Sequence, residues 1–204
     1  MKLLAFTDLH ASVTSYKHVL AKAKKMKPDV IVCCGDFTVF EQNIEPVLDK
    51  INDLPAPVIL LHGNHEQDII VAKLVKRYKN ITFLHRKITK LGEYTFVGHG
   101  GGGFYGQGKL AGDKDFDKFV RDNKKHFTGK IILLTHAPPA HTKLDYLDWM
   151  EDHVGCTSYT EFIKKYNPAL ALSGHIHETF GVTQKFGKTV LCNPGPEGMI
   201  IELK

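Results

Sequence analysis

The sequence lacks the cysteine patterns that mark several common chemistries. Its four cysteines, Cys33, Cys34, Cys156 and Cys192, form no Cys-x-x-Cys pair, which argues against a zinc knuckle and a thioredoxin-like site. No cysteine is followed by an arginine at the spacing Cys-x5-Arg, so the phosphate loop of the cysteine-dependent phosphatases is absent. We therefore expect the chemistry of this chain to use other side chains.

The sequence also lacks long apolar runs. None approaches the roughly 20 residues that a helix needs to span a bilayer. The apolar stretch at residues 3–6 is shorter than the core of a signal peptide, and it runs into Asp8 without a small-residue cleavage site. We therefore expect a cytoplasmic protein without a membrane partner.

The positive charge of the chain is too small to identify a partner. The formal net charge is +5 at pH 7, with lysine clusters at residues 22–27 and 124–125. Such clusters are usually solvated helix faces and less often a nucleic-acid footprint. A small anionic substrate is expected, and nucleic acid is not favoured.

Composition and pattern predict one α/β domain over residues 1–204. The length allows one full hydrophobic core, and 43% hydrophobic residues with 24% charged residues is ordinary for a globular protein. Short apolar runs alternate with helical patterns, which is typical of an α/β sheet protein. Residues 186–188 are expected to turn a terminal hairpin. The apolar runs cover residues 3–6, 30–34, 58–61, 95–97, 131–134 and 169–172.

Two helices are predicted from apolar residues spaced by three and four positions. The first is centred on residues 16–23 and is ended by Pro28. The second covers residues 159–166, with Ser158 and Glu161 as a capping box at its start.

Residues of metal-ligand type follow five of the apolar runs. Loops at the carboxyl ends of strands in an open α/β sheet converge on one crevice, so residues distant in sequence can meet there. Several of the twelve histidines stand at such strand ends. The candidate residues are Asp8, His10, Asp36, Asn64, His65, His136, His175 and His177.

The donor set indicates two divalent ions. Nitrogen and oxygen donors without a thiolate suit Mn, Fe, Co, Ni or Zn, and do not suit an all-oxygen calcium site. Two aspartates, one asparagine and four or five histidines make at least seven ligands, which are too many for one ion. Two ions that share a bridging carboxylate have four each and keep positions for water and substrate. Two such ions with two carboxylates and a hydroxide retain a charge of about +1, which attracts an anion. Manganese is the favoured ion.

These residues resemble the calcineurin-like metallophosphoesterases. The resemblance spans residues 8–177 and implies a four-layer αββα sandwich, in which two mixed sheets face each other and helices lie outside. The five sequence blocks of the family are matched in order by Asp8-Leu9-His10, Gly35-Asp36, Gly63-Asn64-His65-Glu66, His136 and Gly174-His175-Ile176-His177.

The resemblance also implies a role for each matched residue. It places His65 beside the phosphate as a general acid or a stabiliser of charge, and it makes Asp36 the bridge between two metals. The remaining ligands divide into one set for each metal, Asp8, His10 and His177 for the first and Asn64, His136 and His175 for the second.

The sequence departs from the serine/threonine protein phosphatases of this family. Those enzymes carry Asp-Arg-Gly shortly after the bridging aspartate, but here Asp36 is followed by Phe37-Thr38-Val39-Phe40. The phosphate-binding arginine and the acidic partner of the catalytic histidine are missing, which leaves the partner of His65 unassigned. We predict a hydrolase of small or nucleotide phosphodiesters that acts through a metal-bridging hydroxide.

Two alternatives stay open. A small-molecule phosphomonoesterase would use the same metal centre. A non-catalytic metal-binding scaffold would keep the fold without turnover, although the presence of His65 and of all seven ligand positions argues against a degenerate site.

The glycine-rich stretch at residues 98–112 is predicted to be a long mobile loop. Its start matches G-x-G-x-x-G after a strand, but no helical pattern follows, so a dinucleotide site is not expected. A loop that lines the substrate site is the alternative. His62, His99 and His141 are interpreted as surface or supporting residues rather than substrate contacts.

Overall fold

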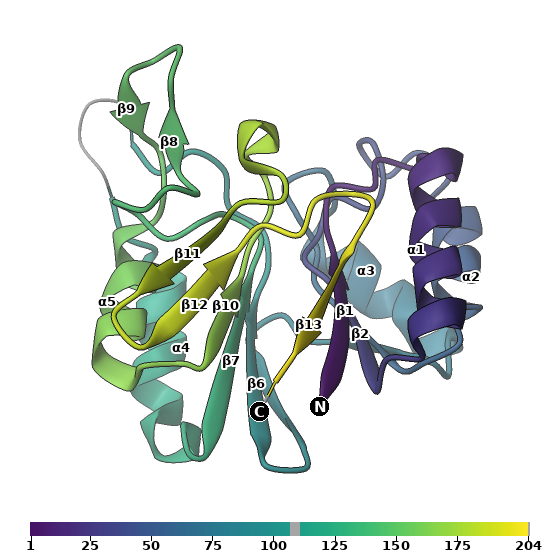
Figure 1. Ribbon diagram of the computed structural model, residues 1–204, viewed down its shortest axis with the longest axis horizontal. Coiled ribbons are helices and arrows are strands. Elements are labelled where there is room, and N and C mark those ends of the chain that lie inside the picture. The colour runs from purple at the N-terminus through teal and green to yellow at the C-terminus, as the bar shows by residue number, and fades with distance from the viewer. Residues whose placement is uncertain (107–110, 204) are drawn as a thin grey trace.

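The computed structural model describes residues 1–106 and 111–203, and two mixed sheets stand side by side in it (Figure 1). The sheet drawn on the right has five strands in the order β13 (Met199–Glu202), β1 (Lys2–Phe6), β2 (Val30–Cys33), β3 (Val58–Leu60) and β4 (Ile81–Phe83). The sheet on the left has six, in the order β11 (Thr183–Phe186), β12 (Thr189–Cys192), β10 (Leu170–Leu172), β7 (Lys130–Thr135), β6 (Tyr94–His99) and β5 (Lys87–Leu91).

Helices cover the outer face of each sheet (Figure 1). The five-stranded sheet is covered by α1 (Val13–Met26), α2 (Ile44–Asn52) and α3 (Asp68–Leu74). The six-stranded sheet is covered by α4 (Lys114–Asn123) and α5 (Thr157–Tyr166). Short 3-10 helices follow at Val75–Arg77, Lys124–His126 and His177–Thr179. No helix in the described part of the chain is long and apolar enough to cross a bilayer.

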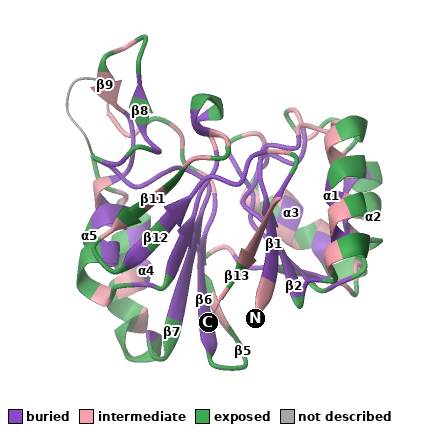
Figure 2. Cartoon of the chain, in the orientation of Figure 1, coloured by how far each residue is buried: buried purple, intermediate pink, exposed green. Residues whose placement is uncertain are grey.

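The layers arise because successive side chains of a strand point to opposite faces of the sheet. In β1, Leu4 and Phe6 pack against the helices, whereas Leu3 and Ala5 pack towards the six-stranded sheet. Because successive strand side chains point to opposite faces, a strand that is buried on both faces must be apolar throughout. The central strands of both sheets are accordingly buried for most of their length, whereas the outer helix faces are exposed (Figure 2). The expected α/β fold with two facing mixed sheets and outer helices is confirmed.

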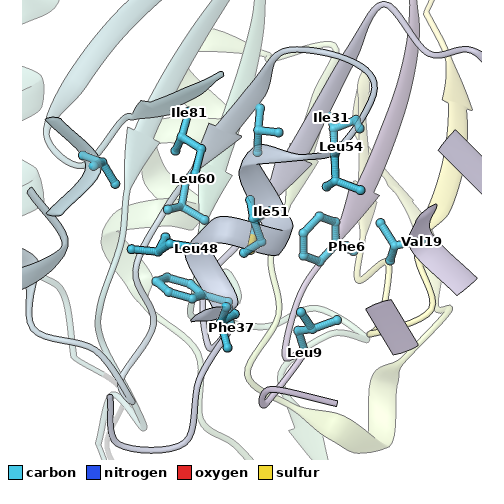
Figure 3. Close-up of a cluster of buried hydrophobic side chains, with 14 of the residues drawn as sticks. Phe6, Leu9, Val19, Ile31, Phe37, Leu48, Ile51, Leu54, Leu60 and Ile81 are labelled. Carbon is cyan, nitrogen blue, oxygen red and sulfur yellow. The ribbon is translucent and has the colours of Figure 1, made fainter. Parts of the chain in front are cut away.

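The core under α2 shows how one helix is held on its sheet (Figure 3). Leu48 and Ile51 point from α2 towards Phe6, Phe37 and the neighbouring strand residues, and each of these four side chains is at most 1% exposed. Full burial of one such side chain contributes roughly 1.5–3 kcal/mol. This packing fixes the loop between β2 and α2, which carries Asp36.

All six apolar runs form strands, and the terminal hairpin is confirmed as β11–β12. Both predicted helices exist, as α1 and α5. The predicted capping box is wrong, because α5 begins two residues earlier with Cys156 as its N-cap. Ser158 lies within the first turn, where its Oγ accepts a hydrogen bond from the Asp113 N–H, and Glu161 pairs with Lys164 at 3.0 Å.

The strands that carry the candidate ligands run parallel. β1, β2 and β3 are parallel neighbours in one sheet, and β7 and β10 are parallel neighbours in the other. Their carboxyl ends lie at the same edge of the molecule, which is the upper edge in Figure 1. A small hairpin of β8 (Tyr146–Leu147) and β9 (Asp152–His153) stands at this edge, and Leu147 and Val154 pack on Ile176.

The glycine-rich segment is irregular where it is described. Residues 100–106 have no regular secondary structure, and no helix follows the G-x-G-x-x-G match within them. Residues 107–110 of the predicted loop lie outside the described residues.

Candidate metal centre

The site residues lie in the loops directly after β1, β2, β3, β7 and β10. Backbone hydrogen bonds tie these loops together, because the Asp8 N–H donates to Gly35 O at 3.0 Å and the His10 N–H donates to Asp36 O at 3.0 Å. The Gly174 N–H donates to His136 O at 2.8 Å and so links the two loops of the six-stranded sheet. The eight candidate residues are therefore brought to one place from both sheets.

Several of these residues adopt backbone angles that side chains disfavour. The φ angles are 51° at Asp8, 45° at His10, 48° at Asp36 and 69° at His175. Left-handed backbone at non-glycine residues costs free energy and is concentrated at functional sites. These backbone angles turn the four side chains towards a common centre, and the surrounding fold maintains the strain.

Two glycines make room for the carboxylates. A Cβ atom at Gly63 would overlap Oδ1 of Asp36, and one at Gly174 would overlap Oδ2 of Asp8. The backbone can therefore approach each carboxylate only because no side chain intervenes.

The first group of candidate ligands is Asp8, His10 and His177, with ligand atoms within 4.8 Å of one another. His177 Nε2 lies 3.5 Å from Asp8 Oδ1, and His10 Nε2 lies 3.9 Å from the same oxygen. The two Nε2 atoms are 3.3 Å apart. These three atoms surround one position suited to a cation.

The second group is Asp36, His136 and His175, again with ligand atoms within 4.8 Å of one another. His136 Nε2 lies 3.4 Å from Asp36 Oδ2 and 3.0 Å from Oδ1 of Asn64. The rings of His136 and His175 are 5.2 Å apart. The side chain of Asn64 therefore lies beside the second group.

Asp36 also belongs to a third group, together with His10 and His65. His10 is part of the first group, whereas Asp36 is part of the second. The carboxylate of Asp36 thus lies between the two positions, where a bridging ligand would stand.

Hydrogen bonds at Nδ1 determine what each histidine can offer at Nε2. His10 donates from Nδ1 to Thr38 O at 3.1 Å, and His136 donates from Nδ1 to Cys34 O at 2.9 Å. A neutral ring with hydrogen on Nδ1 has its lone pair on Nε2, which is the arrangement of a metal ligand with a supporting carbonyl.

His65 has the opposite arrangement. Its Nδ1 accepts a hydrogen bond from the Phe40 N–H at 3.3 Å. A neutral His65 therefore carries its hydrogen on Nε2, 3.7 Å from Asp36 Oδ2, and offers a donor rather than a lone pair. The partner that the sequence left unassigned is a backbone N–H.

Unpartnered buried atoms test whether the site suits a metal. Oδ1 of Asp8 and Nε2 of His175 are buried and make no hydrogen bond. Buried polar atoms almost always find a partner, and a bound ion is one of the few explanations for an exception. One orphaned ligand atom lies in each group, so the residues fit a centre of two ions.

Electrostatics acts in different directions on the residues of the second group. Burial raises the pKa of Asp36, but the hydrogen bond and charge of His136 outweigh it and lower that pKa to about 2. Burial opposes protonation of His136, yet Asp36 raises its pKa to about 9. Burial lowers the pKa of His175 to about 4, so this ring is neutral near pH 7 and its lone pair is available.

Glu66 is a supporting residue to which the sequence assigned no role. Its buried carboxylate accepts hydrogen bonds from the N–H groups of Asp36, Thr38 and Gly63 and from the hydroxyl of Thr38, at 2.7–3.1 Å. Burial raises its pKa to about 7, although the N–H group of Gly63 acts in the opposite direction. Glu66 joins the loop that carries Asp36 to the loop that carries Asn64 and His65.

A fourth group, His85, His99 and Asp115, is less suited to a metal despite similar spacing. Nδ1 of His85 accepts the Gly100 N–H at 3.0 Å, so a neutral His85 has hydrogen rather than a lone pair on Nε2. Asp115 already pairs with Arg86 at 3.3 Å.

The three histidines interpreted as surface or supporting residues lie outside both ligand groups. His62 is buried beside His85, with ring centroids 4.5 Å apart, and His99 is buried against Tyr159. His141 is exposed and faces His153.

Comparison with known proteins agrees with this geometry. Residues 1–179 match the family described as calcineurin-like phosphoesterase. MJ1162, an uncharacterized protein of Methanocaldococcus jannaschii, is 31% identical over 209 aligned residues, which cover 98% of this chain and 91% of that protein.

Two solved structures share the fold at low identity. Phosphopantetheinyl hydrolase (PptH) of Mycobacterium tuberculosis is 16% identical with a TM-score of 0.68, covering 95% of this chain and 88% of that one. An archaeal phosphodiesterase is 15% identical with a TM-score of 0.55, covering 96% and 84%.

The chain belongs to the calcineurin-like phosphoesterase family. It is a metal-dependent hydrolase of phosphate esters, as the sequence predicted.

Proposed function

We propose that this protein hydrolyses phosphodiesters at a centre of two divalent metal ions, with manganese as the favoured ion. Asp8, His10 and His177 would hold one ion, and Asn64, His136 and His175 would hold the other. Asp36 would bridge them.

The position of Asp36 carries this proposal. Its carboxylate shares one group of potential ligands with His10 and another with His136 and His175. A carboxylate between two clusters of nitrogen donors is the arrangement that a pair of ions requires. The orphaned atoms of Asp8 and His175 support one ion on each side.

The ions and the surrounding residues then have separate roles in the reaction. When bound, the two ions lower the pKa of a shared water towards neutral and polarise the ester phosphate. His65 donates its Nε2 hydrogen to a phosphoryl oxygen or to the leaving oxygen, where negative charge develops. The Phe40 N–H holds the His65 ring in the tautomer that makes this donation.

The placement of the arginines favours a diester over a monoester. All three arginines of the chain are described, and each lies near an acidic residue outside the metal groups: Arg77 with Glu45, Arg86 with Asp68 and Asp115, and Arg121 with Asp122. A phosphomonoester dianion is usually gripped by a bidentate arginine, whereas a diester carries a single charge. One structural neighbour is itself named a phosphodiesterase.

The test compares two esters with the same leaving group. The kcat/KM of the Mn²⁺-loaded protein is measured on p-nitrophenyl phosphate and on ethyl p-nitrophenyl phosphate at one pH. We expect the diester to be cleaved at least as well as the monoester. A preference of tenfold or more for the monoester, about 1.4 kcal/mol in transition-state binding, would indicate a small-molecule phosphomonoesterase. No turnover of either ester would indicate a scaffold.

A further inference from the structure

Two exposed phenyl rings stand on histidines of the candidate metal centre. Phe40 is 70% exposed, and its ring lies over the ring of His65, with centroids 4.2 Å apart and planes 32° apart. Phe104 is 49% exposed, and its ring meets the ring of His175 at 5.3 Å. Single exposed apolar residues are common on proteins, but two that border the same site need an explanation.

The loop that presents Phe40 is both strained and anchored. The φ angles are 46° at Phe40, 62° at Glu41 and 53° at Asn43, all in the left-handed region that side chains disfavour. The Glu41 N–H donates to Thr38 Oγ1 at 3.2 Å, and Glu41 accepts the Gln67 N–H at 2.7 Å. Such strain persists only where surrounding bonds impose it, so the exposed ring is held in place.

The segment that presents Phe104 is anchored on both sides. The Gly101 N–H donates to His62 O at 2.8 Å, and the Tyr105 N–H donates to Val154 O at 2.9 Å. The hydroxyl of Tyr105 donates to Asp113 at 2.7 Å. Phe104 is therefore fixed beside His175, although its own ring remains half exposed.

The two phenyl rings lie at opposite ends of one series of contacts. From Phe40 the series passes through His65 to Asp36, at 3.7 Å, and on to His136, at 3.4 Å. It then passes through His175, 5.2 Å from His136 between ring centres, to Phe104. The carboxylate of Asp36 is in the middle of this series, so Phe40 borders the third group of residues and Phe104 borders the second.

A phosphodiester has two ester arms that leave the phosphorus in different directions. We propose that Phe40 and Phe104 bind flat aromatic rings on these arms, so that the substrate is a phosphodiester with an aromatic ring on both arms. The ring is a nucleobase or a simple aryl group, because either presents the π-face that a phenyl ring stacks on. This inference rests on the proposed function.

The experiment uses three diesters that share the p-nitrophenolate leaving group. The retained arm is ethyl, phenyl or 5′-thymidine, and kcat/KM is measured with Mn²⁺-loaded protein. Because stacking of a base on an aromatic side chain changes binding by roughly 5- to 150-fold, the phenyl or thymidine ester should exceed the ethyl ester by at least about fivefold. Preference for thymidine alone identifies a nucleobase, whereas equal preference for phenyl identifies any aryl ring.

The variant Phe40→Ala/Phe104→Ala should remove that preference, so that ring-bearing and ethyl esters have the same kcat/KM. The variant Phe40→Tyr/Phe104→Tyr should restore it. Leu91→Ala, which shortens another exposed apolar side chain at the end of β5, is the matched control and should keep it.

Two results would overturn the inference while the proposed function stands. One is a wild-type protein that cleaves all three diesters without preference. The other is an alanine double variant that loses kcat equally on every ester, because Phe40 would then only position His65. If no ester is cleaved, calorimetry on the Mn²⁺-loaded protein decides. Wild type should bind thymidine 5′-monophosphate at least about fivefold more tightly than ethyl phosphate, whereas the alanine double variant should bind the two equally. Equal affinity of wild type for the two ligands overturns the inference.

Discussion

The backbone N–H of Phe40 donates a hydrogen bond to Nδ1 of His65 over 3.3 Å. An acidic partner would do the reverse, because a carboxylate accepts a hydrogen from Nδ1 and leaves the lone pair of a neutral ring on Nε2. Here the donor leaves the hydrogen of a neutral ring on Nε2. His65 can therefore donate a hydrogen bond from Nε2.

This arrangement predicts the effect of two substitutions at His65. His65→Ala should lower kcat by a factor on the order of 10²–10⁴, the usual contribution of a positioned acid or base. His65→Gln, whose amide N–H can stand in for Nε2–H, should lower it less. Metal content, measured by elemental analysis, should match wild type in both variants. Loss of metal from His65→Ala would instead place His65 among the ligands.

The close approach of Gly63 to Asp36 allows a steric test of the same site. A Cβ in Gly63→Ala would overlap Oδ1 of Asp36 and force that carboxylate to move. We expect Mn²⁺ affinity, measured by calorimetry, to fall at least tenfold. Gly103→Ala is the matched control, because a Cβ there meets nothing within 4 Å and should leave affinity unchanged. Equal affinity in Gly63→Ala and wild type would show that the approach of Gly63 to Asp36 is not required.

The lowered pKa of His85 predicts that the stability of the folded protein depends on pH. Burial lowers its pKa from 6.5 to about 2, and the nearby His62 acts in the same direction. As pH falls, His85 therefore takes up a proton in the unfolded chain before it does so in the folded protein. The folded state loses stability as pH falls below 6.5 and continues to lose it towards pH 2. His85→Asn keeps an acceptor for the Gly100 N–H and removes this titration.

The measurement is urea unfolding with EDTA at pH 7 and pH 5. Between these values the free energy of unfolding of wild type should fall by on the order of 1 kcal/mol more than that of His85→Asn. An equal fall in both proteins would mean that His85 does not stay neutral in the folded state.

Much of the fold could be predicted because buried strands have a simple signature. The runs that became β1, β2, β3, β7 and β10 are apolar throughout, since helices cover one face and the other sheet covers the second. The strands β4 and β13 are less buried, and β13 joins β1 across nearly the whole sequence. Such pairing depends on tertiary structure and leaves little local signal.

Some features of the candidate site could likewise be predicted from the sequence, and others could not. The meeting of the candidate ligands could be predicted, because each follows a buried strand and has a side chain of metal-binding type. The partner of His65 could not, since it is a main-chain N–H presented by Phe40 with a φ of 46°. Glu66 was visible in the sequence, but three of its four hydrogen-bond donors are backbone N–H groups whose positions depend on the folded loops.

Asp36 provides the most direct test of the proposed two-metal centre. Its carboxylate lies between the two ligand groups, so one substitution should affect both ions. Asp36→Asn keeps the size of the side chain and removes its charge. The measurement is the number of Mn²⁺ ions per chain, determined by elemental analysis after dialysis of wild type and Asp36→Asn side by side. We predict two ions per chain in wild type and loss of both from the variant; two ions per chain in Asp36→Asn would contradict the bridging role.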